Sequence, residues 1–387
     1  MRTLHFAESF SLLSETFIYD YVTELERQGV DNHVVTLNRQ NEEARPFPKV
    51  YEVDAPDRWH PLRLWHRLRL RNERIPSRVS FWPQLRNQIV DVASTIRPDV
   101  IHAHFGPAGV IVAPVAERLG IPLVVTFYGY DVSSLPKKTF WKEKYDDLWP
   151  RVDGATVLSE EMRDRVVRFG CPSDRIEVVH LSRGLEEFSF RSPTRPVERV
   201  LFVGRLVPKK APLDAIQAVD QANEQGAGLM LDMVGDGPLL EKARRYVKEN
   251  DLSDTITIHG RLPNTEVAEY MRTADAFLLP SKTAPNGDRE GTPTVLVEAQ
   301  ATGLPCVATR HAGIPEMIPD KFHDLLASEG DVGALAAVLY NLTRQSTNEL
   351  KQIAVQGRRK VEEDFSLSGE VETLRNLYHS LATVPAQ

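Results

Sequence analysis

The sequence contains little cysteine and no long apolar run. Its two cysteines, Cys171 and Cys306, lie in different halves of the 387-residue chain. This placement favours neither a disulfide framework nor a cysteine-based metal site. No stretch approaches 18 consecutive apolar residues, and the opening MRTLHFAESF lacks the apolar segment of a secretion signal. We therefore expect a cytoplasmic protein with neither a classical signal nor a membrane span.

The chain also lacks the positive charge of a general nucleic-acid-binding protein. Its net charge is -7, so a polyphosphate backbone would not attract the chain as a whole. Apolar residues make up 42% and charged residues 26% of the sequence, as in soluble globular proteins. The length suits two domains of roughly 180 residues each.

Short apolar segments alternate with helical ones in both halves, which predicts parallel sheets with helices on both faces. Residues 184–198 interrupt this alternation and include two prolines, so we place a linker there. The expected fold is α/β, with two tandem doubly wound Rossmann-like domains at 1–185 and 199–365 and a ligand cleft between them. The last helix, at 366–383, is expected to pack back on the first domain. The strands are expected at 3–7, 33–37, 100–103, 123–127, 155–158, 176–179, 200–203, 230–234, 255–259, 276–279 and 306–308.

A capped helix follows the strand at 276–279. Thr292 is the expected N-cap and Pro293 the first helical residue, and the helix should end before Gly303. The N–H groups of Gly291, Thr292 and Thr294 would then lack intrahelical partners, which suits an anion or a sugar hydroxyl.

Two acids flank the start of this helix. Glu290 precedes it and Glu298 should lie two turns along it, about 9 Å away at the helical rise per residue. They would then face one cleft and span a long ligand. The alternative is that both are solvated surface acids. However, Glu298 lies in the apolar run VLVEAQA, where a buried acid needs a partner.

Other polar groups follow strands of the second half. Arg205 and Lys210 follow the first of these strands and suit a diphosphate, although a solvated loop is the alternative. Gly235 opens a turn that lacks the spacing of a dinucleotide-binding motif. Arg261 and Leu262 follow the next strand, where backbone groups would be available to a base.

In the first half, His102 and His104 are two residues apart on one expected strand. With no third ligand at a recognisable spacing, we prefer a polar cleft wall to a metal pair. Tyr128 and Asp131, in the segment TFYGYD, should face the same cleft. Thr16 lies at the start of the first expected helix, another position favourable to anions.

The segment 58–86 departs from the acidic average. It contains eight arginines and one acid, interleaved with tryptophan and phenylalanine. Such a segment would be attracted to an anionic membrane surface, and an amphipathic helix with a solvated basic face is the alternative. RNA binding is less favoured because no base-stacking module accompanies the segment.

Taken together, these motifs resemble the family 4 retaining glycosyltransferases of the GT-B fold, especially the colanic-acid and exopolysaccharide branch. The matching segments occur in family order: SETFI at 14–18, HAHFG at 102–106, GRLVPKK at 204–210, VGDGP at 234–238 and the stretch 286–316. The resemblance implies sugar transfer from a UDP- or GDP-sugar to a saccharide or lipid-linked acceptor, with retained anomeric configuration.

The resemblance also implies roles for individual residues. Glu298 matches the residue that binds the donor ribose, and Glu290 the one that approaches the donor sugar. Arg205 and Lys210 match the pair that neutralises the diphosphate, with help from the amides of Gly291 to Val295. Charge is thereby stabilised where it develops, and neither a metal nor a further cofactor is required.

One departure concerns Tyr128, because relatives often have histidine there, in contact with the donor sugar. Tyrosine is not cationic and accepts protons poorly near neutral pH, so His104 is expected to take over some polar contact. An epimerase or hydrolase of the same fold is the alternative enzyme class. A hydrolase would use the two glutamates as proton donor and nucleophile. A non-catalytic membrane scaffold is the third possibility.

Overall fold

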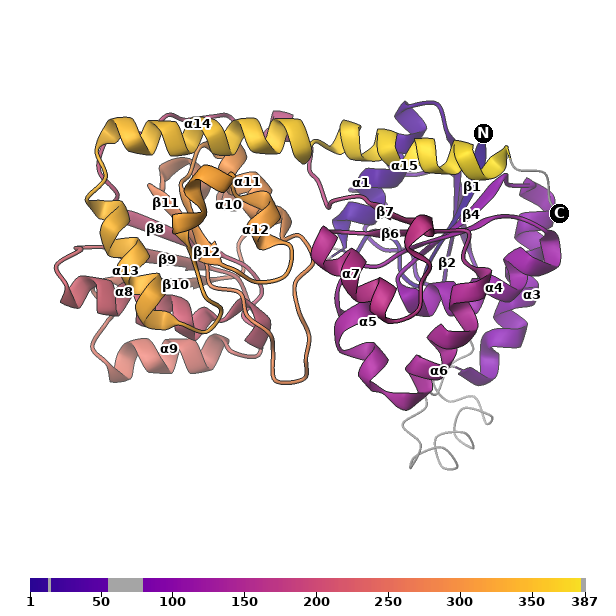
Figure 1. The fold of residues 1–387 in the computed structure, drawn as a ribbon, viewed down its shortest axis with the longest axis horizontal. Coiled ribbons are helices and arrows are strands. Elements are labelled where there is room, and N and C mark those ends of the chain that lie inside the picture. The colour runs from indigo at the N-terminus through magenta and orange to yellow at the C-terminus, as the bar shows by residue number, and fades with distance from the viewer. Residues whose placement is uncertain (13–14, 55–78, 384–387) are drawn as a thin grey trace. The chain divides into compact units, whose positions relative to one another are not determined.

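A computed structural model describes residues 1–387 except 13–14, 55–78 and 384–387. The chain forms two units, each with its own sheet (Figure 1). Unit 1 comprises residues 1–179 and 368–387, and unit 2 comprises residues 180–367. Residues 184–198, expected as a linker, belong to unit 2, where Leu185 and Phe188 are buried.

Unit 1 is built on a seven-stranded parallel sheet of order β3-β2-β1-β4-β5-β6-β7. Its central strands β1, β4 and β5 are almost completely buried because helices cover both faces. The strands are β1 Arg2–Ala7, β2 Asp31–Thr36, β3 Val50–Glu52, β4 Val100–His104, β5 Leu123–Thr126, β6 Gly154–Val157 and β7 Ile176–Val178. The helices are α1 Thr16–Arg27, α3 Trp82–Ile96, α4 Gly106–Leu119, α5 Tyr130–Ser133, α6 Thr139–Leu148, α7 Glu160–Arg168 and α15 Leu367–Ala382.

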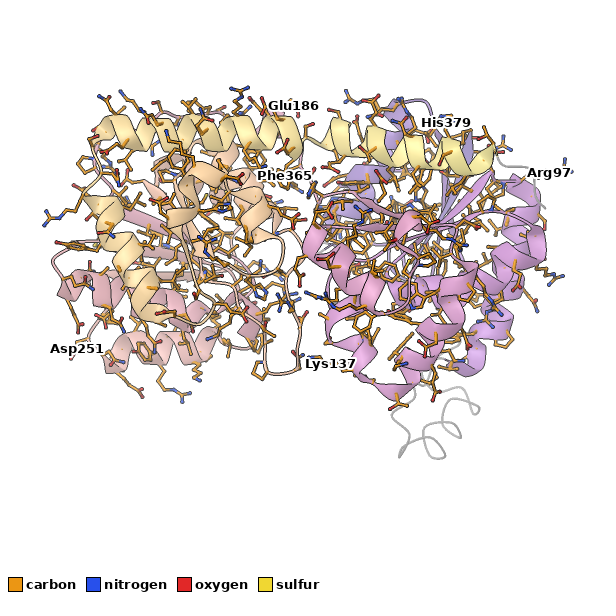
Figure 2. The ribbon with its side chains drawn as sticks, viewed as in Figure 1. Arg97, Lys137, Glu186, Asp251, Phe365 and His379 are labelled. Atoms are coloured by element: carbon orange, nitrogen blue, oxygen red, sulfur yellow. The ribbon has the colours of Figure 1, made fainter. Side chains whose placement is uncertain are left out.

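The last helix, α15, packs in unit 1 although the preceding helix belongs to unit 2 (Figure 1). The side-chain amide of Gln28, just after α1, donates to the carbonyl oxygen of Ser368, 3.0 Å away. Tyr378 is completely buried and bonds to His102 of β4, whereas its neighbour His379 points outward (Figure 2). The C-terminal helix therefore supplies part of the core of unit 1.

Unit 2 contains a six-stranded parallel sheet of order β10-β9-β8-β11-β12-β13. Consecutive residues of β8 enter opposite core layers, Leu201 on one face of the sheet and Phe202 on the other. The strands are β8 Arg199–Val203, β9 Met230–Val234, β10 Ile256–Gly260, β11 Ala276–Leu279, β12 Cys306–Thr309 and β13 Leu326–Ala327. The helices are α8 Pro212–Glu224, α9 Leu240–Glu249, α10 Asn264–Thr273, α11 Thr294–Thr302, α12 Ile314–Met317, α13 Val332–Thr343 and α14 Thr347–Asp364.

The prediction of two parallel, doubly wound α/β units is confirmed. Phe365, just after α14 (Figure 2), is buried in unit 2. Its ring lies against that of His180, with the ring centroids 4.5 Å apart. These contacts hold both ends of unit 2 to its core.

Most of the basic segment lies outside the described residues, which resume at Val79. Of its described part, Phe81 and Trp82 are buried. Arg86 donates to the carbonyl oxygens of Val110 and Ile111. These three side chains are therefore held within unit 1 and are not available to a membrane surface. Within the described ranges, no helix combines the length and apolar character needed to cross a bilayer.

Candidate functional site

The loops that follow β8 and β9 are in direct backbone contact. The N–H of Gly204 donates to the carbonyl oxygen of Val234 at 3.0 Å, and that of Leu206 to Asp236 at 2.9 Å. Gly235 has a φ of 144°, and a Cβ there would collide with the carbonyl oxygen of Gly204. Glycine at 235 is thus required for the two loops to approach each other.

Lys210 and Glu290 meet at the carboxyl edge of this sheet. Lys210 ends a 3₁₀ turn at Pro208–Lys210, after β8, and Glu290 lies in the loop between β11 and α11. Lys210 Nζ is 2.9 Å from Glu290 Oε1, with the two side chains 14% and 7% exposed. Ser281 Oγ donates to the same carboxylate oxygen at 3.2 Å. Residues 80 positions apart thus form a nearly buried ion pair.

The environment keeps Glu290 ionised. Burial raises the pKa of Glu290, but the positive charges of Lys210 and Lys209 outweigh it, so that the pKa is lowered. The carboxylate of Glu290 is therefore negatively charged, and the two lysines balance its charge.

His311 is a contact that the sequence analysis missed. It follows β12 and is completely buried. The N–H of Glu290 donates to His311 Nε2 at 3.2 Å, and His311 Nδ1 bonds to the carboxylate of Glu329. Glu329 also accepts from the N–H and the hydroxyl of Thr283, at 3.3 and 3.0 Å. The signal available in the sequence was a histidine just beyond a strand's carboxyl end.

The expected N-cap at Thr292 is wrong. α11 begins at Thr294 with Pro293 in the cap position, and the Thr292 hydroxyl instead accepts from the N–H of Leu181 at 3.1 Å. Gly291 and Thr292 are buried, whereas Thr294 and Val295 are half-buried. By helix geometry, the first N–H groups of α11 have no carbonyl partner within the helix.

Because α11 starts late, Glu298 is its fifth residue, a little more than one turn from its start. The helical spacing of about 9 Å between Glu290 and Glu298 therefore does not apply, since Glu290 precedes the helix by four residues. Arg183 Nε lies 3.4 Å from Glu298 Oε1, and both side chains are largely buried. The expectation that this acid needs a partner is met by Arg183.

The remaining expected donor-side residues lie at the same sheet edge with different exposure. Arg205 and Arg261 are exposed in the loops after β8 and β10. Leu262 is half-buried and packs against the core layer that contains Phe277. Its side chain therefore has a packing role in unit 2.

Unit 1 buries a cluster of three histidines. His5 of β1 is paired in register with His102 of β4, and His104 lies on the same face. One nitrogen from each lies within 4.8 Å of the others. The third histidine that the sequence analysis did not find is His5, 97 residues before His102. Because all three are at most 2% exposed, His104 does not line an open cleft, contrary to expectation.

Each ring nitrogen of this cluster has a hydrogen-bonding partner. His5 Nδ1 meets His104 Nε2 at 3.1 Å, and His5 Nε2 meets Asn32 Oδ1 at 3.1 Å. The hydroxyls of Tyr378 and Thr126 bond to His102, and that of Tyr128 to His104. Burial lowers the pKa of His5 to about 4 and those of the other two well below 6.5. We therefore interpret the cluster as a hydrogen-bonded network of neutral imidazoles.

Asp131 was expected to face a cleft, but it is completely buried. Its carboxylate accepts from the N–H groups of Gly106, Tyr128 and Gly129 at 3.1, 3.0 and 2.8 Å. It thereby ties the start of α4 to the loop after β5. Burial raises the pKa of Asp131 to about 6.

Tyr128 is half-buried, and its hydroxyl points inward to His104 Nδ1 at 2.7 Å. Burial raises its pKa well above 10.0, so the phenol stays protonated. Its ring lies 4.7 Å from that of Phe17 and 4.4 Å from that of Phe105. Thr16 is the half-buried first residue of α1.

Two family descriptions match the chain, one for each unit. Residues 14–182 match the glycosyl transferase 4-like domain, and residues 186–360 match glycosyl transferases group 1. A putative colanic acid biosynthesis glycosyltransferase, WcaL of Escherichia coli K12, is 32% identical over 95% of this chain and 96% of its own length. The chain belongs to this glycosyltransferase family.

Further similarities agree with this assignment to the family 4-like glycosyltransferases. The amylovoran biosynthesis glycosyltransferase AmsK of Erwinia amylovora is 33% identical over 75% of this chain and 73% of its own length. Anabaena HepE, solved in complex with UDP, shares the fold with a TM-score of 0.75 at 18% identity, over 98% of this chain and 100% of HepE. The comparisons do not support the epimerase or hydrolase alternative.

Proposed function

We propose that this glycosyltransferase moves a sugar from a nucleoside-diphosphate donor to a saccharide or lipid-linked acceptor during exopolysaccharide synthesis. The acceptor class is supported by the names of the relatives, which act in colanic acid and amylovoran biosynthesis. The donor class is supported by the UDP complex of HepE.

The observation that carries this proposal is the ion pair of Lys210 and Glu290. A lysine held 2.9 Å from a nearly buried carboxylate at the carboxyl edge of a parallel sheet lies where doubly wound folds bind nucleotides. In the proposed complex, the donor diphosphate shares Lys210 with Glu290, and Glu290 faces the donor sugar.

The positive charge around the diphosphate comes from the protein in this proposal. Arg205 and Lys210 neutralise charge as it develops on the leaving diphosphate, and the free amides at Thr294 and Val295 add hydrogen bonds. Glu298, on the same helix and oriented by Arg183, binds the ribose hydroxyls. We propose that the reaction needs no metal and retains the anomeric configuration, as the family resemblance implies.

Nucleotide binding is the first test. UDP or GDP should raise the melting temperature of the full chain, and Lys210→Ala or Glu298→Ala should abolish the increase. Lys242→Ala is the matched control because Lys242 is exposed on α9. A melting temperature that no nucleotide changes would contradict the proposed donor class.

Turnover is the second test. A panel of UDP- and GDP-sugars with saccharide and lipid-linked acceptors should yield a glycosylated product whose anomeric configuration, read by NMR, matches that of the donor. Activity should persist in EDTA. An inverted product would refute retention, and loss of activity in EDTA would refute metal independence. Hydrolysis of the donor without sugar transfer would refute the proposed transfer to a saccharide or lipid-linked acceptor.

Peripheral membrane association remains a separate proposal. It rests on the sequence of residues 58–78, which contains seven arginines and two tryptophans. Vesicles containing anionic lipid should bind the chain, and replacing the seven arginines by glutamine should prevent it. Equal binding of both proteins would contradict a role for this segment, and vesicle binding without any sugar transfer would favour the scaffold alternative.

A further inference from the structure

The loop that carries Glu290 is held by a side chain from the next strand-to-helix connection. Glu290 follows β11, whereas His311 follows β12, and the two strands are neighbours in the sheet. The contact between them is the hydrogen bond of 3.2 Å from the Glu290 N–H to His311 Nε2. It fixes the backbone at Glu290, separately from the contacts of its carboxylate.

This contact determines which form of His311 is present. A backbone N–H can only donate, so His311 Nε2 must carry a lone pair and no proton. In the neutral ring the proton then lies on Nδ1, which faces the carboxylate of Glu329. Glu329 can only accept, and it is oriented in turn by the N–H and hydroxyl of Thr283. Donors and acceptors therefore match along the whole chain of contacts.

We propose that His311, held by Glu329 as the Nδ1–H tautomer, is a positioning residue that fixes the main chain at Glu290. Adding a proton to Nε2 would set two N–H groups against each other and release this backbone. The group is fully buried, so the bond cannot be replaced by solvent without a local opening. The consequence for turnover rests on the proposed function of Glu290, whereas the tautomer does not.

Burial favours the neutral ring of His311 at neutral pH, although two carboxylates face it. Burial is the main cause of its lowered pKa, and Arg289 acts in the same direction, whereas Glu329 and Glu290 oppose them. Removing the negative charge of Glu329 should therefore make His311 harder to protonate. The pH at which the hydrogen bond from the Glu290 N–H to His311 is lost should therefore shift downward.

The tautomer is tested on the wild-type chain. Nitrogen NMR of the full-length protein labelled in its imidazoles should show His311 with a proton on Nδ1 and none on Nε2 near pH 7.5. The signals are assigned by their loss in His311→Gln. A proton on Nε2 would overturn the proposal, whether or not the protein transfers sugar.

Two substitutions separate positioning from packing. A glutamine at 311 can place its oxygen near the former Nε2 and accept from Glu290, whereas the shorter asparagine cannot. We expect kcat with the active donor to fall about tenfold or more in His311→Asn and to stay within about threefold of wild type in His311→Gln. Equal losses in both variants, once their folding is verified by circular dichroism, would overturn the positioning role.

The pH profile gives a readout that a merely structural contact would not change. In Glu329→Gln the acid limb of kcat should shift about one pH unit downward, and in His311→Gln the contribution of this group should vanish. Asp232→Asn is the matched control, because Asp232 also pairs with a histidine of unit 2, His259, at 2.7 Å. An acid limb that is identical in wild type and Glu329→Gln would contradict the proposal.

Discussion

The two units bury titratable groups in different ways, although each is a parallel sheet covered by helices. Unit 1 encloses neutral imidazoles, with His5 bonded to His104 and Asn32. Unit 2 encloses charges, with Lys210 paired to Glu290. A neutral network avoids most of the desolvation cost of a charge but is lost on protonation, whereas an ion pair needs both partners. Unit 1 should therefore lose stability when its histidines are protonated, and unit 2 when one partner of its ion pair is removed.

Acid should produce the largest difference between the units. The pKa of His5 is lowered from 6.5 to about 4, so the unfolded chain binds more protons between these values and stability falls as pH decreases. Between pH 6.5 and pH 4, His5 alone should lower the free energy of unfolding by about 3 kcal/mol. His102 and His104 should add to this loss. Glu290, with a folded-state pKa below 4.5, keeps its contribution until the pH falls below that value.

Tryptophan fluorescence can follow unit 1 by itself, because all five tryptophans lie before residue 180. Urea unfolding followed by this signal should show a clear loss of stability from pH 7 to pH 5. The loss should shrink in His5→Gln and persist in His379→Gln, which changes an exposed histidine of α15. A pH-independent tryptophan transition would contradict the neutral network.

Removing one charge should selectively affect unit 2. Lys210→Met leaves Glu290 without its partner and should cost about 3 kcal/mol, and adding Glu290→Gln should restore much of it. Hydrogen exchange in β8 and β11 measures the effect, with Lys242→Met as the exposed control. If the single and double variants are equally stable, the ion pair contributes little.

Asp131 offers a way to sharpen the acid comparison. Its folded-state pKa of about 6 exceeds the model-compound value of 3.8. The folded chain therefore takes up this proton first, and the group opposes the histidines between those values. Asp131→Asn should steepen the fall in unit 1 stability by about 1 kcal/mol per pH unit. The slope of unfolding free energy against pH measures this change, and an unchanged or shallower slope would count against it.

The smallest expected effect comes from one hydroxyl. Tyr378→Phe removes the partner of His102 Nδ1 and should destabilise unit 1 by about 1 kcal/mol, measured by the tryptophan signal. Tyr340→Phe, which removes a hydroxyl bonded to Arg344 in unit 2, should leave that signal unchanged. Equal shifts in both would show that the signal does not report unit 1 alone.

The sequence predicted most strands well because strand periodicity is local, but the short edge strands β3 and β13 were not expected. The expected strand at 230–234 matches β9, and most others begin or end within two residues of the structure. The start of α11 was predicted one residue early, since threonine before proline is a strong capping signal. The competing partner of Thr292, the N–H of Leu181, is 111 residues distant.

The site was predictable only as far as single residues signal their chemistry. Lys210 and Glu290 were selected as individual groups, but their direct pairing depends on how two loops fold back. His311 and Glu329 carry no motif of their own, and His5 becomes part of a cluster only through its register with His102. Asp131 was assigned to a cleft because the sequence does not reveal its three backbone N–H donors. These donors are brought together only when the chain folds.

The placement of α15 has a consequence for synthesis of the chain. Unit 2 is one continuous segment, whereas unit 1 needs Tyr378 from the last helix to complete its core. The residues that leave the ribosome first therefore wait longest for their final partners. Unit 2 can finish folding while unit 1 is still incomplete. A ribosome that stops before residue 368 would release a chain without α15, in which His102 lacks its hydrogen bond to Tyr378.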